Sequence, residues 1–253
     1  GVNGLDMGQR GPFKAARDVS GRVIGTGPIA EIVVIKNGEI AWTQDYSAVE
    51  PNVRLGSKAA LYLTFSSESE PMHPGDNPRG WRPWQGRFRI EGATLESVAG
   101  TDFFNADMQQ LRRDADSPNV VHFATATRGD TSSIVLALKD VKRSARVVVE
   151  LEPGLEFGGG PPIFRRHQKM PESSVELTVN GVKNGTAQAT LRSGPYKDVI
   201  RLHRVAADAP EDVVFSWQDQ GRLQGDHYYV RVTQVDGAMA WSSPIWVGGY
   251  APK

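Results

Sequence analysis

The fold is decided by the stretch IVVIKNGEIAW at residues 32–42. Two short apolar runs flank Asn37-Gly38, a dipeptide that tolerates the positive φ angles of a type I′ turn. The stretch therefore predicts a β-hairpin.

Two further stretches predict hairpins by the same reasoning. Residues 228–235 and 238–241 flank Asp236-Gly237, and residues 175–179 run into Asn180-Gly181, with Asn184-Gly185 following soon after. Along residues 228–233, we expect Tyr228, Val230 and Val232 to face the core and the alternate residues to face solvent. Further strands are expected at residues 60–65, 87–90, 120–127, 133–138, 146–151, 187–191 and 213–217.

Helical periodicity is nearly absent from the chain. The best helix candidate is residues 105–113, with Asn105 as a possible N-cap. The 27 glycines and 16 prolines fall between short apolar runs, which is typical of many strands joined by turns. We therefore expect an all-β fold, an antiparallel β-sandwich organised as two packed β-domains with very little helix.

Charge and cysteine content exclude several classes of function. The 29 basic and 29 acidic residues balance, so no global field would draw the chain onto nucleic acid or an anionic membrane. The absence of cysteine excludes a disulfide scaffold, thiolate metal sites and a cysteine nucleophile. No apolar stretch approaches the roughly 18 residues that a membrane span needs. We expect neither a nucleic-acid partner nor a membrane span.

Motifs at the two ends of the chain are recognisable. They are VNG at residues 2–4, VIGTGPI at 23–29, VIKNG at 34–38, YYVRVTQ at 228–234 and AWSSPIWV at 240–247. Together they resemble the C-terminal β-region of bacterial secreted proteins built around a PHP-type (polymerase and histidinol phosphatase) metal-dependent phosphoesterase domain. Much of that family is described only as a domain of unknown function. The closing motif is the more specific.

The resemblance carries expectations about the whole protein. It implies that a catalytic domain holding divalent metal lies upstream, as part of the same polypeptide or as a cleaved partner chain, and that the location is periplasmic or extracellular. An opening at Gly1 without Met or a leader fits either a removed segment or a piece of a longer polypeptide. The family-like sandwich is expected at residues 1–56 plus 194–253, with a second β-domain inserted at residues 57–193.

The residues themselves give no sign of a catalytic centre. A PHP-type centre needs several His with Asp or Glu ligands, typically seeded by a His-x-His pair. No two of the five histidines lie within 23 residues of each other. There is no Gly-x-Ser-x-Gly elbow, and the glycines at 158–160 lack the Lys-Ser/Thr of a phosphate-binding loop. We predict no catalytic residue, no metal ligand and no cofactor in this chain.

One stretch suggests contact with a ligand, and it lies in the proline-rich segment 70–86. Arg79, Trp81, Arg82 and Trp84 interleave cations with aromatic rings, a composition that could form a stacking platform for a sugar. The alternative, which we favour, is that both tryptophans plug the end of a sandwich and are covered by the arginines.

Three functions stay open. The first is a non-catalytic β-region that packs against the upstream metallohydrolase domain and has a structural or substrate-positioning role. The second is a carbohydrate-binding or surface-adhesion module that uses the Trp81/Trp84 loop. The third is a subunit of a larger assembly that binds other proteins through an exposed strand edge or a long glycine-proline loop, such as that at residues 153–171.

Overall fold

The computed structural model describes the chain in segments, and these contain twenty β-strands and no α-helix. All but one of the strand pairings are antiparallel, so the predicted all-β class is confirmed. The strands fall into two compact units, with unit 1 formed by both ends of the chain and unit 2 by the middle. The described residues are 1–47, 49–50, 52–69, 79–101, 103–158, 167–182, 185–194, 196–206, 209–221 and 225–248.

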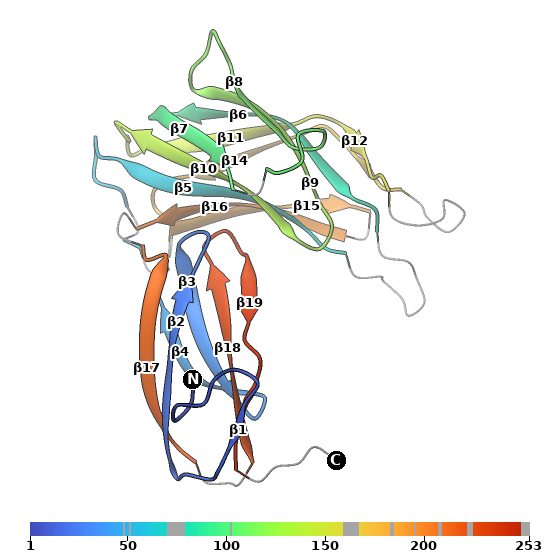
Figure 1. The fold of residues 1–253 in the computed structure, drawn as a ribbon. Helices are drawn as coiled ribbons and strands as arrows, with labels where there is room; N and C mark the ends of the chain where they lie inside the picture. The colour runs from blue at the N-terminus through green and yellow to red at the C-terminus, as the bar shows by residue number, and fades with distance from the viewer. Residues whose placement is uncertain are drawn as a thin grey trace. The chain divides into compact units, whose positions relative to one another are not determined.

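Unit 1 comprises residues 1–48 and 208–253. A six-stranded sheet has the order β1-β20-β18-β3-β4, with β19 also paired to β18, and β2 pairs with β17 as a separate two-stranded sheet (Figure 1). The strands are β1 (Arg10–Gly11), β2 (Ala16–Ile24), β3 (Ile29–Lys36), β4 (Glu39–Asp45), β17 (Asp212–Gln220), β18 (Asp226–Gln234), β19 (Met239–Trp241) and β20 (Ile245–Val247).

The two sheets of unit 1 share one apolar core. Alternate residues of β2 and β17, such as Val19 and Phe215, pack with Ile32 and Val34 of β3 and with Tyr228 of β18. The alternation arises because successive side chains of a strand point to opposite faces. The side of β18 predicted to face the core therefore does so at Tyr228.

The hairpin at residues 32–42 is confirmed as β3 and β4. Asn37 and Gly38 have φ of 53° and 89°, the positive values that a type I′ turn requires. The predicted hairpin of β18 and β19 also forms, but with a different turn. Only Gly237 has positive φ, and its N–H donates to the carbonyl of Gln234 at 3.0 Å, as in a type I turn that ends in a glycine bulge.

Unit 2 comprises residues 49–207 and is a sandwich of two five-stranded sheets. One sheet has the order β15-β16-β5-β10-β7 and the other β14-β11-β6-β9-β8, and β12 pairs with β13 at one side. The strands are β5 (Ala59–Ser67), β6 (Arg82–Glu91), β7 (Thr94–Gly100), β8 (Gln110–Arg113), β9 (Val120–Thr127), β10 (Thr131–Lys139), β11 (Arg146–Leu151), β12 (Gly154–Leu155), β13 (Lys169–Met170), β14 (Ser173–Thr178), β15 (Thr186–Ser193) and β16 (Tyr196–Val205).

Two local predictions for unit 2 are wrong. Residues 175–179 do not begin a hairpin, because β14 pairs with β11 of one sheet while β15 pairs with β16 of the other. The helix expected at residues 105–113 is a turn followed by β8, which pairs with β9. Backbone pairing with the edge of β9 stabilises residues 110–113 as a strand, and this outweighs the weak helical pattern of the segment.

The units also differ from the predicted domain bounds. The sequence predicts residues 194–253 as part of the family-like sandwich, but β16 lies between β15 and β5 and pairs with both over eight residues each. Because β16 completes a sheet of unit 2, the second boundary lies at residue 207 rather than 193.

Gly86 is required where β6 runs between β11 and β9. A Cβ at this position would lie 2.0 Å from the carbonyl oxygen of Glu150, and φ is +152°. We expect Gly86→Ala to lower the free energy of unfolding of unit 2 by about 3 kcal/mol, because the backbone of a central strand must shift. Gly181→Ala is the matched control, since Gly181 also has positive φ but open space around it, and should cost about 1 kcal/mol. Calorimetric unfolding of both variants checks this, and equal losses would contradict it.

Candidate functional site

The predicted ligand-binding arginines lie inside unit 2 and are paired there. Arg79 Nε donates to Glu156 Oε1 at 2.7 Å and Arg79 Nη1 to Asp198 Oδ1 at 2.6 Å. Arg82 Nε donates to Asp198 Oδ2 at 2.9 Å, and Ser193 Oγ donates to the same oxygen at 2.5 Å. All five residues are buried, and burial lowers the pKa of Arg82 despite the attraction of Asp198.

The two tryptophans of this stretch do not form an exposed stacking platform. Trp84 is 0% exposed, packs on Phe65, and donates its indole N–H to Thr127 Oγ1 at 2.9 Å. The Arg82 guanidinium lies 3.6 Å from the centre of the Trp84 ring. Trp81 is half-buried and bridges to Phe157. The carbohydrate hypothesis required both rings exposed beside a groove, so the buried Trp84 removes its structural basis at this loop.

The cluster instead joins the two sheets of unit 2. Asp198 belongs to β16 in one sheet, and Arg82 begins β6 in the other. Two guanidinium groups and two carboxylates balance one another, which is the condition for keeping charges in a protein interior. The arrangement resembles a structural clamp rather than a binding site.

Removing one partner of this cluster should be costly. We expect Asp198→Asn to lower the free energy of unfolding by about 3–5 kcal/mol, because both arginines then lose their shared buried counter-charge. Asp212→Asn is the control, since the Arg22–Asp212 pair is exposed to solvent, and should leave the free energy of unfolding nearly unchanged. Urea unfolding of the two variants provides the measurement, and similar losses would show that the clamp is not stabilising.

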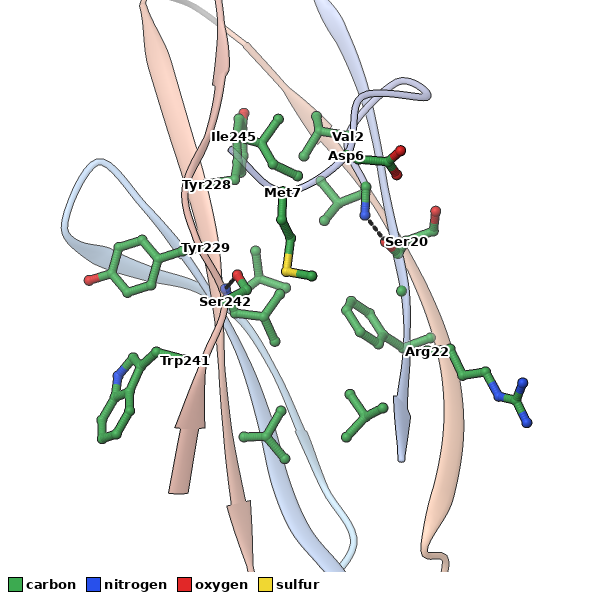
Figure 2. Close-up of a pocket in the computed structure, with 18 of the residues that line it drawn as sticks. Val2, Asp6, Met7, Ser20, Arg22, Tyr228, Tyr229, Trp241, Ser242 and Ile245 are labelled. Atoms are coloured by element: carbon green, nitrogen blue, oxygen red, sulfur yellow. Dashed lines mark hydrogen bonds between the residues drawn. The ribbon is translucent and has the colours of Figure 1, made fainter. Parts of the chain in front are cut away.

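A hollow with a mainly apolar lining lies in unit 1. Its volume is about 530 Å³, and it is bounded by β2 on one side and by β18 with β19 on the other (Figure 2). Its floor consists of core residues, among them Val19, Val34, Phe215 and Tyr228. Val230 and Val232 also line it and are only half-buried.

Three large exposed apolar side chains lie near this hollow, but they do not all face it. Met7 is 64% exposed and points into the hollow, between Tyr228 and Ser20 in the view of Figure 2. Trp241 on β19 is 57% exposed, but its ring points away from the hollow (Figure 2). Ile24 at the end of β2 is 70% exposed and lies on the strand face opposite to Val23. The accessible apolar surface of the hollow is therefore formed by Met7 together with the half-buried Val230 and Val232, and such a concave apolar surface is suited to binding.

Tyr228, which lines the hollow, is fixed in place by polar contacts on its buried side. The Tyr228 hydroxyl donates to Asp219 Oδ2 at 2.7 Å, and Lys36 Nζ lies 2.6 Å from the same oxygen. Burial alone would raise the pKa of Asp219, but the hydrogen bonds from Lys36 and Tyr228 outweigh it and lower that pKa. Burial and the bond to Asp219 raise the pKa of Tyr228, so its hydroxyl stays protonated.

These contacts predict a pH-dependent stability of unit 1. Because the folded-state pKa of Asp219 is lowered, its contribution is present above the unfolded value of about 4 and is lost as the pH falls through the folded value. We expect Asp219→Asn to lower the melting temperature at neutral pH, and the gap from wild type to narrow below about pH 4. Melting curves across this range test it, and an unchanged gap in acid would contradict the assignment.

No group of three or more metal-binding side chains occurs within the described segments. His122 contacts Asp114 at 3.2 Å, and His203 bonds to Thr186 across β15 and β16. His73 lies outside the described residues. The histidines that are described are thus dispersed over different strands and loops.

Strands β2 and β16 are not among the strands predicted from the sequence, although both carry a signal. In β2 the alternate residues Arg17 and Val19 are buried, and in β16 so are Tyr196, Asp198 and Ile200. A period of two was present, but charged residues on the buried side concealed it. The partners of Arg79 could not be found from sequence, since Glu156 and Asp198 lie 77 and 119 residues away.

The structure thus defines an all-β protein with two units, each built from two facing layers of strands. No family model matches the chain, and no solved structure matches it. An uncharacterized protein of Chlamydia pneumoniae is 44% identical over 52 residues. This stretch is 21% of the present chain but only 7% of the Chlamydia protein, so the similarity covers a small part of a longer bacterial polypeptide. No helix of the described residues is long and apolar enough to cross a membrane.

Proposed function

We propose that this chain is the non-catalytic β-region of a larger secreted, metal-dependent hydrolase whose PHP-type phosphoesterase domain lies upstream. The observation that carries the proposal is the pairing of the two motif-bearing ends. Strand β3, which holds VIK of the opening motif, pairs with β18, which holds YYVRVTQ of the closing motif. The residues behind the resemblance therefore belong to one folding unit with one core.

Two further observations support this proposal. The sequence predicts a second β-domain inserted between the two family-like ends, and unit 2 lies between the two halves of unit 1 in the sequence. A domain that packs on an upstream partner needs an apolar surface, and the hollow lined by Met7, Val230 and Val232 provides one. In this proposal the divalent metal and the hydrolytic residues belong to the upstream domain, and the protein is periplasmic or extracellular.

A role in protein association is a related candidate, favoured by the open edge of β2 described below. The carbohydrate-binding alternative has no comparable support, because Trp84, one of the two tryptophans of its proposed platform, is buried in the core.

The proposal is tested on the full-length protein from its native source. We expect an intact mass well above 27.6 kDa, bound divalent metal, and hydrolysis of bis(p-nitrophenyl) phosphate that is lost with a chelator and restored by added metal. The chain that begins at Gly1 is the control and should neither hold the metal nor hydrolyse the ester. A mature protein that begins at Gly1 directly after a signal peptide would overturn the proposal.

A further inference from the structure

Strand β2 has one edge that is only partly paired. On one side it pairs with β17 along its whole length, from Ala16↔Gln220 to Ile24↔Asp212. On the other side residues 1–3 pair with it: Asn3 N–H donates to Asp18 at 2.9 Å, and Gly1 and Ser20 exchange bonds of 2.5 and 3.0 Å. Beyond Ser20, none of the described residues forms a strand pairing with this edge.

The main-chain groups that are left open can be identified from this pattern. In an antiparallel ladder, alternate residues direct their N–H and C=O groups to the same side. Asp18 and Ser20 face residues 1–3, so Arg22 and Ile24 direct theirs to the open edge, while Val23 faces β17. An open strand edge beside apolar surface is a template for another strand.

The hollow lies directly beside this open edge. The larger sheet of unit 1 has six strands and the smaller has only β2 and β17, so part of β18 has no covering strand. Val230 and Val232 are half-buried for this reason. A strand placed about 4.8 Å from β2 would complete the ladder and cover both valines.

We infer that the polypeptide immediately upstream of Gly1 continues as an antiparallel strand along β2 and fills the hollow; this inference rests on the proposed function, which places a catalytic domain upstream. The Gly1 nitrogen already donates to Ser20 at the end of the hollow. Residues that precede Gly1 therefore pass Gly21 to Ile24 without a turn. Covalent attachment gives this segment a high effective concentration, which favours it over a separate peptide.

The register specifies the side chains of the added strand. Val2 lies opposite Val19, and both are buried, whereas Gly1 lies opposite the exposed Ser20. The first and third residues before Gly1 thus lie opposite Gly21 and Val23 and face the hollow. They are expected to be apolar, and the second and fourth residues to be polar.

Hydrogen exchange tests the added strand directly. In the full-length protein the Arg22 amide should exchange at least about tenfold more slowly than in the chain that begins at Gly1. The Val23 amide faces β17 in both proteins and serves as the internal control. Equal exchange of Arg22 in the two proteins overturns the inference, as does protection that appears only when a separate protein is added.

A matched pair of variants isolates the hydrogen bond. Arg22→Pro removes the N–H that faces the open edge and leaves the β17 ladder intact, whereas Arg22→Ala keeps the N–H. In the full-length protein, we expect protease to cleave the segment before Gly1 at least about tenfold faster in the Arg22→Pro variant than in the Arg22→Ala variant. Equal cleavage contradicts the inference. If the same preparation retains metal-dependent hydrolysis while Arg22 stays unprotected, only the added strand is refuted and the proposed function stands.

Discussion

Unit 1 depends on the hydrogen-bonded pairing of β3 with β18, two strands separated in the sequence by the whole of unit 2. Without this ladder the apolar residues of β3 would have no partner strand on that side, and the core beneath them would open. The chain must therefore leave unit 1 and return to it. Unit 2 makes this possible through its own fold, because its first and last long strands are neighbours, with Ala60 opposite Val205. An insertion whose ends meet adds little closure entropy to the unit that surrounds it.

Both units place charged residues inside an apolar framework. In unit 1, Arg17 and Asp226 form a fully buried pair, with Asn37 donating to the second oxygen of Asp226. In unit 2, Asp198 joins Arg79 and Arg82. Such pairs add little net stability compared with apolar side chains of the same size, but an unpaired member is very costly. Each pair therefore penalises any arrangement of strands that separates its members.

The two units differ in how completely their layers cover each other. Unit 2 has five strands in each layer, and its core residues are closed on both sides. In unit 1 a layer of six strands faces a layer of two strands. The smaller layer leaves Val230 and Val232 half-buried and the hollow open. The uncovered area coincides with strands that carry the family-like motifs. A surface used for attachment to another part of a protein would have this combination of apolar floor and open backbone edge.

By itself the sequence determined most strands and the turn at Asn37-Gly38, because a period of two and a dipeptide tolerant of positive φ are local properties. It also determined the all-β class. The tertiary structure decided which strands pair with each other, because pairing between distant segments is not encoded in a local pattern. Residues 175–179 became a crossover between sheets, and β16 joined unit 2, because a strand pairs with whichever edge is available. A ligand site at Arg79 and Arg82 stayed open as an alternative because their counter-ions are remote in the sequence, whereas the favoured prediction, a buried tryptophan covered by arginine, holds for Trp84 and Arg82. Only folding brings those carboxylates within hydrogen-bonding distance, and only the unequal number of strands in the layers of unit 1 leaves β2 with an open edge.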